Sequence, residues 1–120
     1  MSFRSQLEQI VKDVQGAVAC SVMGFDGIAI ETHLAEDPGV DVNTILVEYS
    51  NVLGKLKEAT ASLQAGGMSE VAISTEKLTT IARLLTPDYY LVLALTPDGN
   101  YGKGRYALRI AAPMLKAELG

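Results

Sequence analysis

Few residues in this sequence have the type and spacing that catalysis or metal binding requires. The chain has one histidine, His33, and one cysteine, Cys20, which excludes a Cys/His metal cluster and a Cys–His catalytic pair at a useful spacing. Cys20 alternates with valines in an apolar stretch, which indicates a buried structural thiol. The acidic residues Glu36 and Asp37 lie in a polar loop without a partner base. These residues therefore predict no catalytic or metal site.

One glycine-rich segment has a nucleotide-binding pattern. Residues 102–107, GKGRYA, match G-x-G-x-x-A, follow a predicted strand and open a predicted helix. A dinucleotide site also needs a second parallel strand and an acidic residue about 20 positions further on, and the sequence ends sooner. A phosphate-binding loop requires Ser or Thr after Lys103, where Gly104 stands. We therefore expect no cofactor and no enzyme, and the glycines are predicted to let the chain turn into its helix.

The composition is that of a globular domain. The 120 residues are 48% hydrophobic and 20% charged, which suits one domain spanning residues 1–120. The net charge of −4 argues against a surface for nucleic acid or an anionic membrane. A single cysteine fits a reducing compartment, and neither a signal peptide nor an apolar run of about 18 residues is present. We expect a cytoplasmic protein.

Three stretches have helical periodicity. The first covers residues 2–15, with Ser2 as its N-cap and Gly16 after its last turn. The second begins after the predicted cap Asp41 and runs to about residue 64. The third runs from about residue 102 to 119, and Pro113 inside it should kink it or remove one hydrogen bond.

The second predicted helix carries more apolar residues than one buried face needs. Gly54 in its middle costs about 1 kcal/mol relative to alanine, which suggests close packing of another helix. We therefore expect one flank to cover the sheet and the other to meet a second subunit. The predicted stripe, widened by Leu46 and Leu53, is Val42, Ile45, Tyr49, Val52, Leu56 and Leu63.

Five stretches are predicted to be strands. Residues 17–34 form a hairpin around Gly24-Phe25-Asp26-Gly27, with Val18, Cys20 and Val22 on one face of its first strand. Residues 68–75, 78–86 and 89–95 follow, and their short links make them antiparallel. The order α-β-β-α-β-β-β-α predicts a single sheet with helices on its faces.

Two surfaces stand out as binding sites. Phe25 lies at a predicted turn tip beside Asp26 and Ile28, which is typical of an interface anchor, unless the ring folds back on its own sheet. Strand 68–75 has no proline and only Glu70 as a charged residue. Such an unprotected edge favours pairing with another strand, and a symmetric dimer would satisfy it.

These elements resemble the roadblock/LC7 family, in its bacterial MglB-like group. The best local matches are residues 23–30, MGFDGIAI, and residues 95–103, LTPDGNYGK, and the resemblance covers essentially the whole chain. It implies an α/β (α+β layered) fold with a five-stranded antiparallel sheet in the order 2-1-5-4-3. The long helix would cover one face of the sheet, and the terminal helices the other.

The resemblance also implies a homodimer, in which the third strands pair edge to edge and the second helices pack side by side. The interface it implies consists of Glu70, Val71, Ala72, Ile73 and Ser74 on the strand, with Tyr49, Val52, Leu53 and Leu56 on the helix.

Members of this family are non-catalytic platforms for Ras-like small GTPases, or adaptors. Bacterial members act in cell polarity and gliding motility, where the MglB type activates a small GTPase of the MglA type. The length and the tip of this chain are most similar to a shorter paralogue that binds the MglB type. The resemblance implies an adaptor that docks another roadblock protein through Phe25, Asp26 and Ile28, with recruitment to cell poles through its partners. The alternative is direct binding or activation of the GTPase through the paired second helices.

Overall fold

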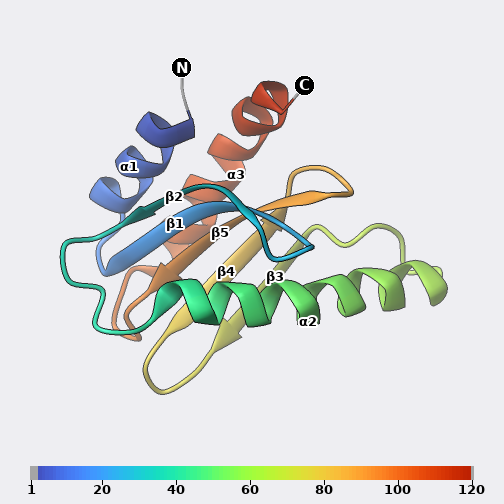
Figure 1. The fold of residues 1–120 in the computed structure, drawn as a ribbon, viewed down its shortest axis with the longest axis horizontal. Helices are drawn as coiled ribbons and strands as arrows, with labels where there is room; N and C mark the ends of the chain where they lie inside the picture. The colour runs from blue at the N-terminus through green and yellow to red at the C-terminus, as the bar shows by residue number, and fades with distance from the viewer. Residues whose placement is uncertain (1–2, 120) are drawn as a thin grey trace.

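A five-stranded antiparallel sheet forms the middle layer of the structure, a computed structural model that describes residues 3–119 (Figure 1). The strand order is β2-β1-β5-β4-β3, which confirms the predicted order 2-1-5-4-3. The apolar residues of β5 are buried on both faces, as a central strand requires. The strands are β1 (Ala17–Gly24), β2 (Ala29–Leu34), β3 (Glu70–Ser74), β4 (Thr79–Leu84) and β5 (Tyr89–Leu95).

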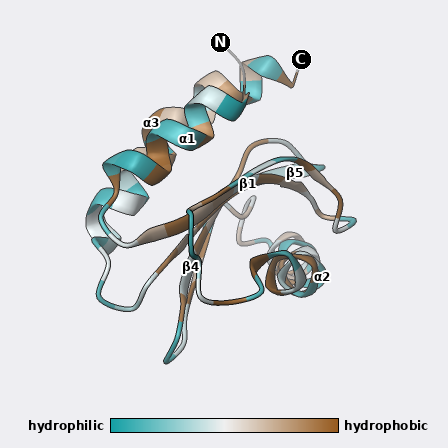
Figure 2. Cartoon of the chain, turned by 60° about the vertical axis from the view of Figure 1, so that its left-hand side comes forward, coloured by the Kyte–Doolittle hydropathy of each residue, from teal (hydrophilic) through white to brown (hydrophobic). Residues whose placement is uncertain are grey.

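Three helices cover the two faces of this sheet. Helices α1 (Phe3–Asp13) and α3 (Tyr101–Glu118) pack on one face, and α2 (Val42–Ser62) packs on the other (Figure 2). Each face therefore has its own apolar core, and the sheet separates the two. The predicted arrangement of one long helix opposite two terminal helices is confirmed.

The helix starts depend on short polar side chains. The Asp41 carboxylate accepts hydrogen bonds from the Thr44 amide at 3.3 Å and the Thr44 hydroxyl at 2.7 Å, so the predicted cap of α2 is confirmed. Asn100 caps α3 by accepting from the Lys103 amide at 3.1 Å. That helix therefore begins slightly earlier than predicted, and it continues through Pro113. The predicted cap Ser2 lies outside the described residues.

The predicted face of β1 was wrong at Val18. Cys20 and Val22 pack in the core beneath α1 and α3, whereas Val18 packs in the core beneath α2. The pairing of β1 with β5 shifts register between Ala17 and Ala19, and this irregularity turns Val18 to the opposite face. Simple alternation does not predict such a shift.

The structure divides the apolar stripe predicted for α2 into a buried and an exposed flank. The side chains buried along this helix are those of Val42, Leu46, Ser50 and Leu53, whereas Val52, Leu56 and Leu63 are exposed. Ser50 is accommodated inside because its hydroxyl bonds both the Leu46 carbonyl and the Tyr90 hydroxyl. The apolar flank that remains outside is therefore available for other contacts.

Candidate protein-binding surfaces

The hairpin tip between β1 and β2 is held by its own hydrogen bonds. The Gly24 amide donates to the Ile28 carbonyl at 2.8 Å, and the Gly27 amide donates to the Gly24 carbonyl at 3.0 Å. The Asp26 carboxylate accepts from the Ile28 amide at 3.0 Å, and Gly27 has a φ of +89°, a conformation that favours glycine. Asp26 therefore shapes the turn and also presents an exposed charge.

Phe25 does not project freely from this tip. Its ring is half-buried, with its centroid 5.0 Å from that of Tyr90 and the two planes tilted by 40°. The Lys57 ammonium lies 4.6 Å from the centre of the Phe25 ring, and the Phe25 amide donates to the Asp88 carbonyl at 3.1 Å. The ring therefore folds back on its own sheet, which is the alternative that the sequence left open.

Ile28 is the residue of the tip that faces solvent most fully. It is 68% exposed. Val47, on α2, is also exposed, and one of its methyl groups would lie 3.6 Å from a Cβ atom built on Gly27. Val47 therefore extends the tip toward α2, and we call Phe25, Asp26, Ile28 and Val47 the tip surface. Sequence reasoning missed Val47, because the only signal was an apolar residue outside the predicted stripe.

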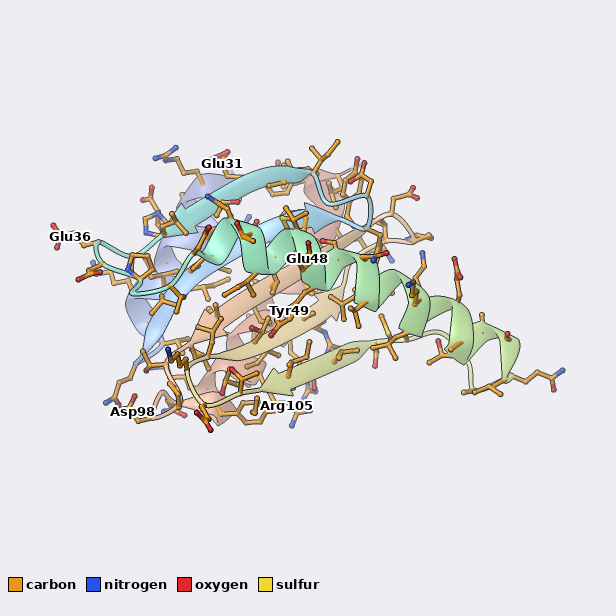
Figure 3. All side chains as sticks on the ribbon, turned by 60° about the horizontal axis from the view of Figure 1, so that its bottom comes forward. Glu31, Glu36, Glu48, Tyr49, Asp98 and Arg105 are labelled. Carbon is orange, nitrogen blue, oxygen red and sulfur yellow. The ribbon has the colours of Figure 1, made fainter. Side chains whose placement is uncertain are left out.

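A second apolar surface lies along the free edge of the sheet. Val71 of β3 packs against the core beneath α2, and Ile73 shares its face of the strand. Val52 and Leu56 are exposed on α2, and the half-buried Tyr49 lies on the side of this helix toward β4 and β3 in Figure 3. We call these five residues the edge surface.

The other predicted dimer residues are placed differently. Leu53 is only 1% exposed and belongs to the core of the protomer. Glu70 points to the opposite face, where its carboxylate lies 2.7 Å from the Arg105 guanidinium and 3.5 Å from that of Arg83. Its hydrogen bond and charge raise the pKa of Arg105. Because Glu70 is occupied by two arginines, its charge protects the strand edge less than the sequence suggests.

Ala72 and Ser74 are exposed on β3 and alternate with Val71 and Ile73. They therefore offer backbone groups rather than apolar side chains to a neighbouring strand. Gly54 has open space around it, so nothing in the protomer explains a glycine there.

The remaining candidate groups lack the surroundings that chemistry needs. Cys20 is fully buried, and burial raises the pKa of its thiol, which keeps the sulfur protonated. Among residues 3–119, no group of three or more acidic, histidine or cysteine side chains could hold a metal ion. Within the same part of the chain, no helix has both the length and the apolarity needed to cross a bilayer.

The glycine-rich segment has a packing role. A Cβ atom at Gly104 would lie 3.1 Å from a Leu93 methyl group and 3.3 Å from one of Ile81. Gly104 therefore lets α3 approach the sheet closely, one turn beyond the point where the chain enters the helix. The turn itself is capped by Asn100, so the predicted role of the glycines is only part of the explanation.

Comparison with known proteins identifies relatives of this fold among solved structures. No family model matches the chain, and no curated protein sequence matches it. Among solved structures, MglC from Myxococcus xanthus is 52% identical, with 98% of this chain and 99% of that chain covered and a TM-score of 0.73. A roadblock/LC7 domain from Streptomyces avermitilis has a TM-score of 0.84 at 10% identity, with 99% and 98% of the two chains covered. MglB from Myxococcus xanthus has a TM-score of 0.81 at 11% identity, with 96% and 85% covered.

The two distant structures share the fold alone, whereas the identity to MglC extends over nearly the whole of both chains. The strand order and the placement of the three helices agree with this likeness. The chain belongs to the roadblock/LC7 family and is an MglC relative within it.

Proposed function

We propose that the chain is a non-catalytic, dimeric adaptor of a gliding-motility and cell-polarity module. It binds another roadblock protein, of the MglB type, and so modulates a Ras-like small GTPase of the MglA type. The observation that carries this proposal is the 52% identity to MglC across nearly the full length of both chains. Such an adaptor works in the cytoplasm and reaches the cell poles through its partners.

The tip surface is the proposed site for the other roadblock protein. Ile28 is the proposed anchor, because its exposed side chain can bury apolar area against a partner without any change in the packing of the protomer. The Asp26 carboxylate adds an exposed charge beside it. Phe25 mainly supports this site, since the packing of its ring on Tyr90 fixes the position of the turn.

The edge surface is the proposed homodimer interface. Pairing of two β3 edges would satisfy the outward backbone groups of this strand and place the exposed flanks of two α2 helices together. Val52 and Leu56 are 47% and 40% exposed in the protomer, so both have area to bury on dimerisation. The double variant Val52→Asp/Leu56→Asp should sediment as a monomer where the wild type sediments as a dimer; an unchanged dimer would refute this interface.

The adaptor proposal is tested by binding of a purified MglB-type protein from the same organism. Biolayer interferometry compares the wild type with Ile28→Asp and with Leu63→Asp, a control whose parent side chain is 78% exposed at the end of α2. Ile28→Asp should lose binding, and Leu63→Asp should retain it. Equal binding by all three proteins would exclude the tip surface as the docking site.

The second candidate is direct regulation of the GTPase, in the manner of the MglB type. It would use the exposed apolar side chains of the paired α2 helices, among them Val52, which is 47% exposed in the protomer. A GTPase of the MglA type that binds in one nucleotide state, with equal strength to the wild type and Ile28→Asp, would support this candidate over the adaptor.

A further inference from the structure

A basic pocket lies between α3 and the end of β4. Helix α3 covers the sheet face opposite α2 (Figure 2). The pocket has a volume of about 320 Å³, and its lining includes Arg83, Arg109 and Lys116 but no acidic residue. The chain as a whole has a net charge of −4, so the pocket carries the opposite sign from the protein around it. A concave site lined by one sign of charge attracts a ligand of the other sign.

Two of these cations have no carboxylate partner in the part of the chain that the structure describes. Arg109 and Lys116 are exposed and seven residues apart, which places them on one side of α3. Neither takes part in an ion pair among residues 3–119. Arg83 lies 3.5 Å from the Glu70 carboxylate, but Arg105 lies closer to that carboxylate, at 2.7 Å. The positive charge of the pocket is therefore largely uncompensated.

The rest of the lining is apolar. It consists of Leu84 and Leu85 at the end of β4, with Ala112 and Pro113 of α3. Leu85 and Ala112 belong to the core beneath α1 and α3, whereas Leu84 and Pro113 keep accessible area. A ligand that suits this lining offers apolar area beside its negative charge, because a bare anion would leave the apolar part uncovered.

Pro113 also leaves a backbone acceptor on this side of α3. Proline has no amide hydrogen, so the Arg109 carbonyl, four residues earlier, lacks its usual donor within the helix. Both residues line the pocket. A peptide ligand can supply the missing N–H group from its own backbone, whereas a carboxylate or a fully ionised phosphate group cannot.

We propose that the basic pocket binds a short acidic segment of a protein partner, in which carboxylates flank an apolar side chain. The apolar side chain covers Leu84 and Pro113, and the carboxylates face Arg109 and Lys116. A backbone N–H group of the segment donates to the Arg109 carbonyl. This site is independent of the proposed function, because it lies across the sheet from the α2 helix that borders the tip and edge surfaces.

The pocket favours this occupant over three others. Inorganic phosphate brings charge but no apolar area for the lining. An anionic bilayer would meet a protein of net charge −4, which disfavours its approach. A second copy of this chain could offer its acidic loop, residues 35–41, but Val40 in that loop already packs against the core beneath α2.

The test uses a fluorescein-labelled synthetic peptide of about ten residues, in which glutamates flank a central pair of leucines. In the control peptide, glutamines replace the glutamates, so that the shape and the apolar area are kept and only the charge is lost. Fluorescence anisotropy should show that the wild type binds the acidic peptide at least about tenfold more tightly than the control, and that added salt weakens the complex. Equal binding of the two peptides would overturn the proposal.

Variants then locate the site. Arg109→Glu/Lys116→Glu should weaken binding at least about tenfold through like-charge repulsion. The matched control Lys12→Glu/Lys77→Glu makes the same change in net charge at exposed lysines outside the pocket, and it should weaken binding less than about twofold. Pro113→Ala restores a donor for the Arg109 carbonyl, so it should weaken binding about three- to tenfold without lowering Tm. Far-ultraviolet circular dichroism checks that each variant is folded.

Three further results would overturn the proposal. One is an equal loss of binding in the two double variants, because net charge alone would then explain the affinity. Another is wild-type affinity in Pro113→Ala together with displacement of the peptide by inorganic phosphate at constant ionic strength, which would indicate a general anion site. The third is loss of a wild-type oligomer in Arg109→Glu/Lys116→Glu, measured by sedimentation, which would make a second copy the occupant.

Discussion

Replacing Phe25 by alanine separates a structural from a binding role at the hairpin tip. Truncating a fully buried phenylalanine costs about 3–5 kcal/mol, and a half-buried ring loses about half of that. The contact with Tyr90 contributes about 0.5–1.5 kcal/mol within this total. We therefore expect Phe25→Ala to lower the free energy of unfolding by about 1.5–2.5 kcal/mol, because the ring packs on Tyr90 and beneath Lys57.

The assay is urea denaturation followed by circular dichroism, with thermal melting alongside. A domain of this size loses about 3–5 °C in Tm per kcal/mol, so Phe25→Ala should melt about 5–12 °C lower than the wild type. Phe25→Leu retains most of the apolar area and should lose only about 1 kcal/mol. Ile28→Ala should lose no more than about 0.5 kcal/mol, since Ile28 is 68% exposed.

A loss below about 0.5 kcal/mol for Phe25→Ala would refute the packing of this ring. It would also restore Phe25 as a free anchor at the tip. If the predicted loss is found, weak partner binding by Phe25→Ala would be uninformative, and Ile28→Asp would be the proper probe of the tip surface. The stability measurement therefore comes before any binding experiment.

Three further predictions follow from buried groups. Ser50→Ala leaves the Tyr90 hydroxyl without its partner and should cost about 1–3 kcal/mol, whereas combining it with Tyr90→Phe should recover part of the loss in a double-mutant cycle. Gly104→Ala should destabilise by about 1–3 kcal/mol in urea titrations, because its methyl group would crowd the sheet. Gly102→Ala should be neutral or stabilising, because a Cβ atom there would meet only the Asn100 side-chain oxygen, at 4.0 Å. Burial raises the pKa of Cys20 and Tyr90 in the folded state, so the unfolded chain releases these protons at a lower pH than the folded protein does. Their contribution to the free energy of unfolding is therefore complete below the unfolded pKa values of about 8.5 and 10, and it is lost as pH rises above them. Stability should therefore fall above about pH 8.5, and Cys20→Ala should flatten the first part of that decline; a profile that is flat to pH 10.5 would contradict this.

Local signals in the sequence were sufficient for most of the elements. The capping role of Asp41 could be predicted, because a short acidic side chain just before a helical apolar pattern can accept hydrogen bonds from the first free amides of the helix. The extent of β5 was readable because a central strand is apolar on both faces, and the structure reproduces its predicted bounds, Tyr89–Leu95. Family resemblance, rather than periodicity, supplied the strand order.

The binding surfaces required the tertiary structure. The orientation of α2 was ambiguous, because a helix with two apolar flanks can bury either, and only packing against the sheet placed Ser50 inside and Val52 outside. The basic pocket joins Arg83 of β4 to Arg109 and Lys116 of α3, so no local pattern could reveal it.

At the hairpin tip, the sequence by itself determined the turn, since Asp26 and Gly27 fix its backbone through local bonds and a positive φ. The direction of the Phe25 ring was decided only by the fold. A side chain at a turn can reach either solvent or a neighbouring surface, and here Tyr90, distant in sequence, lies close enough to pack against it. Backbone conformation at such sites follows from neighbours along the chain, whereas side-chain burial follows from neighbours in space.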